Sequence, residues 1–359
     1  MKQRKTDKQS KKDRFLWADI TRIIAIFFVV QSHSLYISSK SSEIVAFISF
    51  ILLHLEKICV PLFVMLSGSL LLKKEEGLVV FAKKRVLKVL VPWVLWTGIY
   101  MWYRLTYSPA QNSFVTEFFH NTYSPVVQWF HFFVHTFITI LWFLPVIVAL
   151  YLLTPLLKII IKRVPTYFAG ILILLWFILI SVIPYLTNKT VYFTYELTMR
   201  TIMQYVGYYF LGYYLIWKKH WKFIFYLLPL PIIIGLFPEL FSAFPIDRQY
   251  IQGFSANYMT PGIIMASIAS FLFLFYIFRS VKIKNAINSK TQKIILALSK
   301  ASLGVYIIHG VVIDQMRYVL YPQFDNFNAL IFYPLLIFAI SAIIVIVIQQ
   351  IPILRRAIP

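Results

Sequence analysis

Acidic residues are scarce in this chain of 359 residues. Only 13 Asp and Glu stand against 35 Lys and Arg, and charged residues of both signs make up 13% of the sequence. That share is about half of what a soluble protein of this length carries. With 60% hydrophobic residues, the composition excludes an ordinary soluble enzyme, and it excludes disorder, which requires low hydrophobicity. The class that remains is an all-α integral membrane protein.

Several signatures of soluble chemistry are also missing. The single cysteine, Cys59, excludes an internal disulfide and a thiolate metal cluster. The sequence has no Walker A motif, no G-x-S-x-G nucleophile elbow and no His/Cys or His/carboxylate spacing for a metal. We therefore expect neither ATP-driven transport nor a bound metal. The net charge of +22 is explained by Lys and Arg on cytoplasmic loops, so we expect no nucleic-acid partner.

Apolar segments of about 20 residues, the length that spans a bilayer, recur along the whole chain. Segments two and nine exceed the usual length, so we expect a tilt or kink in each. Residues 1–14 are strongly basic, and no small-residue cleavage site follows the first segment, so we expect that segment to be retained. The ten predicted spans are 15–36, 44–72, 86–103, 136–157, 166–186, 202–217, 221–238, 256–278, 294–320 and 328–351.

The distribution of positive charge supports about ten transmembrane helices. Most of the 35 Lys and Arg fall on alternate connections, beginning with the N-terminal tail, as expected for loops on the cytoplasmic side. Losing or adding one helix would invert every later loop and destroy this asymmetry. We therefore predict a basic cytoplasmic tail over 1–14, one transmembrane domain over 15–351 and a cytoplasmic tail over 352–359, with both termini inside the cell and the protein in the plasma membrane.

Three ionisable residues lie in the first apolar segment, where each is costly unless it faces a partner or a polar tunnel. Asp19 and Arg22 are three positions apart and so lie within pairing distance on one helix face. Arg22 and His33 are eleven positions apart, which is close to three turns, so they share a face about 16 Å apart along the axis. This spacing suits a polar tunnel with a cation near the cytoplasm and a titratable imidazole deeper in. The alternative is an interfacial Arg22 and a structural His33.

A second basic cluster opens the third apolar segment. Lys83, Lys84, Arg85 and Lys88 precede Pro92. Arg85 and Lys88, three positions apart at the inner interface, are suited to hold a phosphate-bearing cytosolic ligand together. The alternative is the ordinary positive charge of an inner loop.

Two further segments contain small or polar residues inside apolar runs. Ser67-Gly68-Ser69 near the inner end of the second segment permits close approach of a helix or a ligand, and helix packing is the simpler interpretation. In the ninth segment, Tyr306 and His309 lie in the run SLGVYIIH, with His309 near mid-membrane. One buried histidine is more often structural than catalytic, but two histidines in separate helices favour a functional interpretation.

Taken in order, these motifs resemble the membrane acyltransferase 3 family over nearly the whole chain. Arg22-x10-His33 resembles the first-helix signature of that family, and VPLFVMLSGSLLL resembles its second-helix stretch. Lys84-Arg85-x-x-Lys88 resembles the third-helix basic motif. Further along, LWFLPVIVALYLLTPLL and SLGVYIIH resemble two later helices. The family usually has arginine at both basic positions of the third-helix motif; Lys88 keeps the charge but lacks the bidentate fork of arginine.

The resemblance implies an enzyme that transfers an acyl group, usually acetyl, from cytosolic acyl-CoA to a hydroxyl of a surface or exported glycan. By the same resemblance, Arg22, Arg85 and Lys88 would hold the phosphates of coenzyme A, and His33 would act as the general base or carry the acyl group transiently. Asp19 would orient Arg22. The supporting residues of the site would be Asp19, Ser67, Tyr306 and His309.

The implied partners are acetyl-CoA or another acyl-CoA, a surface glycan or its lipid-linked precursor, the lipid bilayer and proteins of a glycan-synthesis system. Two other classes compete with this hypothesis. A glycan exporter of the same family would not bind coenzyme A, and many transporters show repeats or paired broken helices that the sequence lacks. A structural subunit of a synthesis complex would lose abundance rather than activity when His33 or Arg22 is replaced.

Overall fold

The computed structural model describes residues 15–34, 48–49, 52, 55–107, 140–186, 199–218, 258–280, 283, 286–320, 327–352 and 354–358. Within these ranges the regular secondary structure is helical, with no strand. The elements are α2 (Leu16–Ser34), α4 (Cys59–Leu71), α5 (Leu78–Phe81), the π-helix η1 (Ala82–Val86), α6 (Leu87–Tyr107), α9 (Phe143–Arg163), α10 (Thr166–Phe177), the π-helix η4 (Ile178–Val182), α11 (Ile183–Leu186), α12 (Met199–Trp217), α16 (Pro261–Arg279), α18 (Ser289–Leu320), α19 (Phe327–Ile348) and the 3₁₀ turn η6 (Leu354–Arg356).

Six helical stretches of the described chain are long and apolar enough to cross a membrane: Leu16–Ser34, Phe143–Arg163, Thr166–Tyr185, Pro261–Arg279, Ser289–Arg317 and Leu330–Ile348. The prediction of an all-helical, multi-pass membrane protein is therefore confirmed. Each predicted span except 221–238, which lies outside the described residues, overlaps one of the helices above. The total of ten spans and the cytoplasmic position of the termini stay predictions.

Several helix boundaries differ from those predicted, and two of the differences have a clear physical reason. The fourth predicted span ended at residue 157, but α9 continues through Lys158 to Arg163, because Lys and Arg are good helix formers whose charged ends can reach water. Pro165 then stops the helix by holding Val164 in an extended conformation, with φ −93° and ψ 128°. In the long second span, a turn at Lys57 and Ile58 precedes the first residue of α4. This turn is the interruption that the length of that span suggested.

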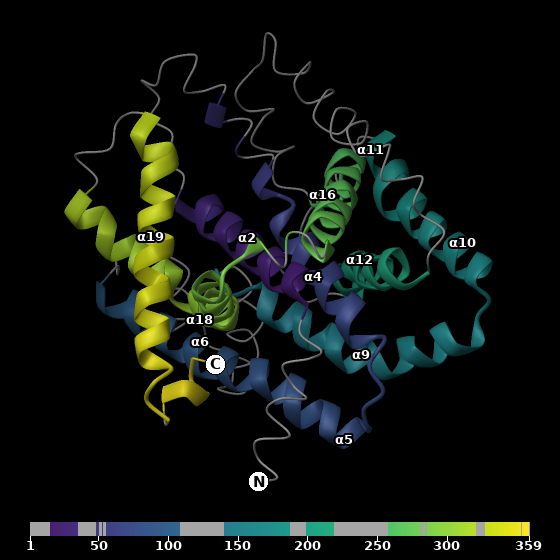
Figure 1. The fold of residues 1–359 in the computed structure, drawn as a ribbon, viewed down its shortest axis with the longest axis horizontal. Helices are drawn as coiled ribbons and strands as arrows, with labels where there is room; N and C mark the ends of the chain where they lie inside the picture. The colour runs from purple at the N-terminus through teal and green to yellow at the C-terminus, as the bar shows by residue number, and fades with distance from the viewer. Residues whose placement is uncertain are drawn as a thin grey trace, which may run out of the picture.

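Helix α2 lies among the other helices and contacts four of them, α4, α16, α18 and α19 (Figure 1). Its apolar side chains are accordingly buried on several sides; Ala25, Ile26 and Val30 are completely buried. Near its start, the ring of Trp17 packs edge-on against Phe275 of α16, with ring centroids 5.1 Å apart. Because α2 is surrounded, the polar residues along it must meet other helices rather than lipid.

Helices α4 and α12 pack closely because each places a glycine at their contact. A Cβ atom on Gly68 would overlap the main-chain carbonyl of Tyr209, and a Cβ atom on Gly212 would overlap the main chain of Met65. Small residues allow helix backbones in a membrane to approach in this way. The packing interpretation of Gly68 is therefore confirmed, and the structure identifies α12 as its partner.

Large apolar side chains that face outward are concentrated on α10 and α19. Such a surface would be costly in water but is the normal outer surface of a helix in lipid. Their periodic spacing indicates that these two helices lie at the periphery of the bundle. On α10 the exposed residues are Tyr167, Phe168, Ile171, Leu172, Leu174 and Leu175, and on α19 they are Ile331, Phe332, Leu335, Leu336, Ile343, Ile344 and Val347.

Candidate functional site

Asp19 and Arg22 pair on α2 as their spacing predicts, and a third residue joins them from a distant part of the chain. The guanidinium Nη1 of Arg22 lies 3.3 Å from Asp19 Oδ1 and donates to Ser299 Oγ of α18 at 2.7 Å. The Ser299 hydroxyl in turn donates to Asp19 Oδ1 at 2.7 Å. Asp19 is buried, with 6% of its surface exposed. These contacts fix the position of Arg22 and join α2 to α18.

The predicted cations of the third segment lie near Arg22. Arg85 belongs to the π-helical turn η1, and Lys88 lies in the first turn of α6. The ammonium of Lys88 experiences the positive charges of Arg85, Arg22 and Lys300, the last of which follows Ser299 on α18. The structure therefore brings the three predicted phosphate-binding residues together and adds a fourth cation. Single π-helical turns are frequent at functional sites, and this one presents Arg85.

These cations have few counter-charges nearby. Within the described residues, Arg22 pairs with Asp19, and Arg85 lies within electrostatic range of Glu76. Among the described residues, the buried Nε of Arg85 has no hydrogen-bond partner. Gathering like charges is unfavourable unless anions compensate them, and an unpaired N–H group of a guanidinium is ready to bind one. The chemistry of this end of the site thus suits a multiply charged anion.

Ser67 lies on α4 beside this cluster, where its side chain hydrogen-bonds the hydroxyl of Tyr151 on α9. Tyr151 is within electrostatic range of both Arg85 and Arg22. One turn further along α9, Thr154 Oγ1 donates to a main-chain carbonyl, so at 2.8 Å it accepts the hydroxyl hydrogen of Tyr209 on α12. A short row of hydroxyl groups therefore lies next to the cations inside an otherwise apolar bundle.

His33 lies at the other end of α2 and is partly buried. Its Nδ1 atom is 3.1 Å from the main-chain oxygen of Val29. A carbonyl oxygen only accepts, so Nδ1 carries the hydrogen and Nε2 keeps its lone pair. Ser32 Oγ, 3.3 Å from Nδ1, already donates to Val29 and is left to accept. The hydrogen bonds thus fix the tautomer in which Nε2 can act as a base.

His309 of α18 is completely buried and contacts His33, with ring centroids 5.2 Å apart and planes inclined by 58°. Its Nδ1 is 2.7 Å from the main-chain oxygen of Tyr306 and 3.2 Å from that of Val305. The same argument leaves Nε2 of His309 with a lone pair, and this buried atom has no hydrogen-bond partner in the part of the chain that the structure describes. The structure therefore brings together the two histidines that the sequence places 276 positions apart.

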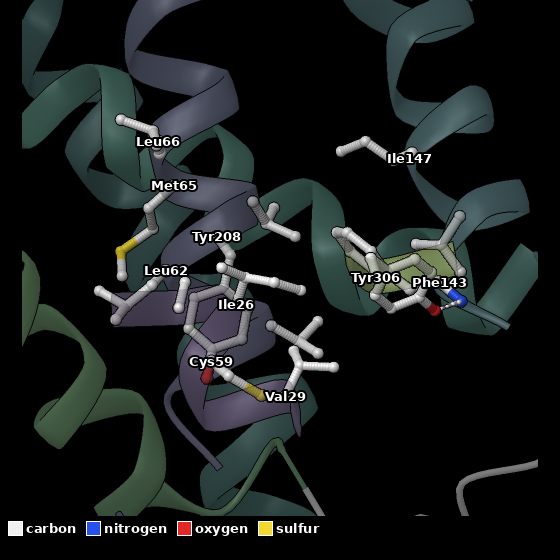
Figure 2. Close-up of a cluster of buried hydrophobic side chains, with 14 of the residues drawn as sticks. Ile26, Val29, Cys59, Leu62, Met65, Leu66, Phe143, Ile147, Tyr208 and Tyr306 are labelled. Atoms are coloured by element: carbon white, nitrogen blue, oxygen red, sulfur yellow. Dashed lines mark hydrogen bonds between the residues drawn. The ribbon is translucent and has the colours of Figure 1, made fainter. Parts of the chain in front are cut away.

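Tyr306 anchors the start of α9 near the two histidines. Its hydroxyl donates to the main-chain oxygen of Ile140 at 2.6 Å. The same hydroxyl accepts from the main-chain N–H of Phe143 at 3.2 Å (Figure 2). Figure 2 also shows Val29 of α2 beside Cys59 of α4, in the apolar cluster next to this anchor. Since the hydroxyl of Tyr306 is engaged twice, the geometry gives it a positioning function.

Charged residues also lie near the histidine end of the site. Lys57 and Arg317 act electrostatically on His33. Lys57 Nζ is 3.6 Å from Oε1 of Glu56, whose surface is 1% exposed. The buried Oε2 of Glu56 has no hydrogen-bond partner within the described ranges. This end of the site therefore has both signs of charge, unlike the cationic end around Arg22.

Sequence reasoning did not identify Ser299, Lys300 or Tyr151. A signal for Ser299 was present, because Ser299 precedes Tyr306 and His309 by seven and ten positions and so lies on their helix face. Lys300 looked like one of several loop lysines, although it lies inside α18. Tyr151 lies in the middle of an apolar run of α9, and nothing in its neighbours distinguishes it from a packing residue.

The family model described as an acyltransferase domain, of the acyltransferase 3 type, matches residues 15–349, which is nearly the whole chain and includes every site residue above. Comparisons with curated proteins and with solved structures gave no match.

Proposed function

Since this chain belongs to the acyltransferase 3 family, we propose that it is a membrane-embedded O-acyltransferase. The donor is cytosolic acyl-CoA, with acetyl as the transferred group, and the acceptor is a hydroxyl of an exported or surface polysaccharide or its lipid-linked precursor. Proteins of a glycan-synthesis system supply or receive that glycan. The protein lies in the plasma membrane with both termini in the cytoplasm, an orientation supported by the excess of Lys and Arg on alternate connections.

The observation that carries this proposal is the arrangement of polar groups along α2. Arg22 near one end lies within electrostatic range of Lys88, as do Arg85 and Lys300, while Nε2 of His33 at the other end keeps its lone pair. Cations at one end suit the phosphates of coenzyme A, and a neutral imidazole at the other suits the removal of a proton from a hydroxyl. An elongated donor with phosphates at one end and a thioester at the other matches this separation of about 16 Å.

In the proposed reaction, Arg22, Arg85 and Lys88 hold the phosphates, and Asp19 and Ser299 keep Arg22 in place. Ser67 and Tyr151 lie beside these cations, with Tyr151 within electrostatic range of Arg85 and Arg22. The acceptor oxygen attacks the thioester carbonyl while its proton passes to Nε2 of His33. The carbon–sulfur bond then breaks, and the thiolate of coenzyme A takes the proton from His33. The ester product and free coenzyme A leave on opposite sides of the membrane.

The test is turnover of acetyl-CoA by the purified protein in lipid, measured as release of the coenzyme A thiol. Wild type is expected to bind and consume acetyl-CoA. His33→Ala is expected to bind coenzyme A with the same Kd but to react about 10²- to 10⁴-fold more slowly, the usual contribution of a positioned base. A wild type that neither binds nor consumes any acyl-CoA would overturn the proposal and make glycan export the hypothesis to test.

A further inference from the structure

The short segment of residues 354–358, which follows α19, folds back onto the helical bundle (Figure 1). The main-chain N–H groups of Ala357 and Ile358 both donate to the carbonyl oxygen of Leu354 at 3.0 Å, so the segment closes into a tight turn. The turn leaves its two arginines exposed and buries Ile358, which is 4% exposed. We call residues 354–358 the docked segment.

The docked segment lies between α6 and α18. On the α6 side, the indole N–H of Trp96 donates to the main-chain oxygen of Ala357 at 3.1 Å. On the α18 side, Gly304 leaves room for Ile358, because a Cβ atom on Gly304 would overlap side-chain carbons of Ile358 and of Val345 on α19. The absence of a side chain at Gly304 therefore forms a slot that the buried end of the docked segment fills.

The two helices that hold the docked segment also carry cations of the donor site. On α6, Lys88 lies eight positions before Trp96, which is about 12 Å along the helix axis. On α18, Lys300 lies four positions before the glycine slot, which is about 6 Å. Further along both helices, the hydroxyl of Tyr100 donates to the main-chain oxygen of Ile307 at 2.8 Å. The docked segment thus joins α6 and α18 between this direct contact and the cations.

Repulsion among the cations makes such a connection useful. Lys88 experiences the positive charges of Arg85, Arg22 and Lys300. Without an anionic ligand, this repulsion pushes the start of α6 away from α2 and α18. A helix displaced in this way must be returned to its place when the ligand binds, which lowers the affinity. A connection that holds α6 in place beforehand removes that cost.

We propose that the docked segment positions the start of α6, and with it Arg85 and Lys88, for the phosphates of the acyl-CoA donor. This inference rests on the proposed function, in which these cations bind coenzyme A. Ile358 and Trp96 are positioning residues, because they act on the donor through α6 and not by touching it. Their loss weakens donor binding without slowing the transfer step in the saturated enzyme, since His33 lies on α2.

The test compares Ile358→Ser with Leu354→Ser, which replaces an exposed apolar side chain of the same segment. Calorimetry in lipid measures the Kd for coenzyme A, and thiol release measures kcat at saturating acetyl-CoA. We expect Ile358→Ser to raise the Kd about 2- to 10-fold, because the ligand must now order cations that the docked segment orders in wild type. The kcat is expected to stay unchanged. Leu354→Ser should match wild type, and Ile358→Val, which still fills the slot, should restore most of the affinity.

Trp96→Phe is a milder change that tests the same connection if Ile358→Ser does not fold. It removes the hydrogen bond to Ala357 and keeps an aromatic ring at the position. We expect the Kd for coenzyme A to rise about 2- to 5-fold, with kcat unchanged.

The other outcomes overturn the inference. An unchanged Kd in both Ile358→Ser and Trp96→Phe, with a lower thermal unfolding midpoint, would show that the docked segment only stabilises the fold. Equal effects of Ile358→Ser and Leu354→Ser would show that the glycine slot is not the cause. In either case the proposed function stands if wild type binds and consumes acetyl-CoA. A wild type that binds no coenzyme A overturns the proposed function and this inference together.

Discussion

Ser299→Ala tests how the site holds Arg22. The Ser299 hydroxyl accepts from Arg22 and donates to Asp19, both at 2.7 Å, so the substitution removes two hydrogen bonds to charged groups. Each such bond contributes about 1.5–3 kcal/mol. Because Arg22 is 29% exposed in its side chain and keeps its direct contact with Asp19, water and that contact recover part of the loss. We expect a net destabilisation of about 1.5–3 kcal/mol.

The same substitution is expected to weaken coenzyme A binding. Without Ser299, the guanidinium of Arg22 loses one of the groups that hold it, so it is less well ordered and must be ordered again when the ligand binds. Ordering a long side chain costs about 0.5–1.5 kcal/mol, which corresponds to a Kd about 2- to 10-fold higher. Calorimetry with coenzyme A measures this change, and denaturant unfolding in mixed micelles measures the stability.

Ser302→Ala is the matched control for Ser299→Ala. Ser302 lies one turn further along α18 and donates to the main-chain oxygen of Ser299 at 2.9 Å, a contact within its own helix. We expect a stability loss below about 1 kcal/mol and an unchanged Kd. Ser299→Thr, which keeps the hydroxyl, should recover most of the binding. If Ser299→Ala and Ser302→Ala behave alike in both assays, Arg22 is not held by this network and the reasoning is wrong.

Three further substitutions test other parts of the structure. Gly68→Ala should destabilise the protein by about 1–3 kcal/mol because the added methyl group meets main-chain atoms of α12. Gly98→Ala, where an added Cβ has no described atom within 4 Å, is the control and should be neutral or stabilising. Thermal unfolding in detergent compares the two variants, and equal unfolding midpoints would contradict the α4–α12 contact. Lys300→Ala should raise the Kd for coenzyme A several-fold at low salt and less at high salt, and a salt-independent or absent effect would place Lys300 outside the donor site. The hydrogen bond from Lys162 lowers the pKa of the exposed Glu75 carboxyl, so any stability that this pair contributes is present at neutral pH and is lost as the pH falls through the lowered pKa. Because both side chains are exposed, Glu75→Gln should leave the thermal unfolding midpoint at pH 7 unchanged. A clear drop in that midpoint would contradict this expectation.

The helices were predictable because lipid imposes a single simple requirement on the sequence. A spanning segment must be long and apolar, and the segments around Ile26 and Ile337 show this without ambiguity. The end of α9 was not predictable by the same rule. Lys158 and Arg163 look like a loop on hydropathy alone, yet they extend the helix until Pro165 stops it. Charge at a helix end thus marks the membrane boundary rather than the end of the helix.

The site was predictable where its residues belong to one helix and obscure where they do not. The positions of Arg22 and His33 on one face of α2 follow from helix geometry. Ser299 contributes only because α18 packs on α2, and a contact between positions 280 apart cannot be calculated from spacing. Tyr151 is similar: its hydrogen bond to Ser67 depends on how α9 meets α4.

The measurement that tests the central claim most directly is calorimetric binding of coenzyme A to the purified protein in lipid. Wild type is compared with Arg85→Ala and with Lys83→Ala, an exposed neighbour in the same π-helical turn. The account predicts that Arg85→Ala raises the Kd about 10- to 100-fold, the loss of a charge-assisted contact to phosphate, while Lys83→Ala changes it little. A wild type that binds no coenzyme A, or equal effects of the two substitutions, would contradict the account.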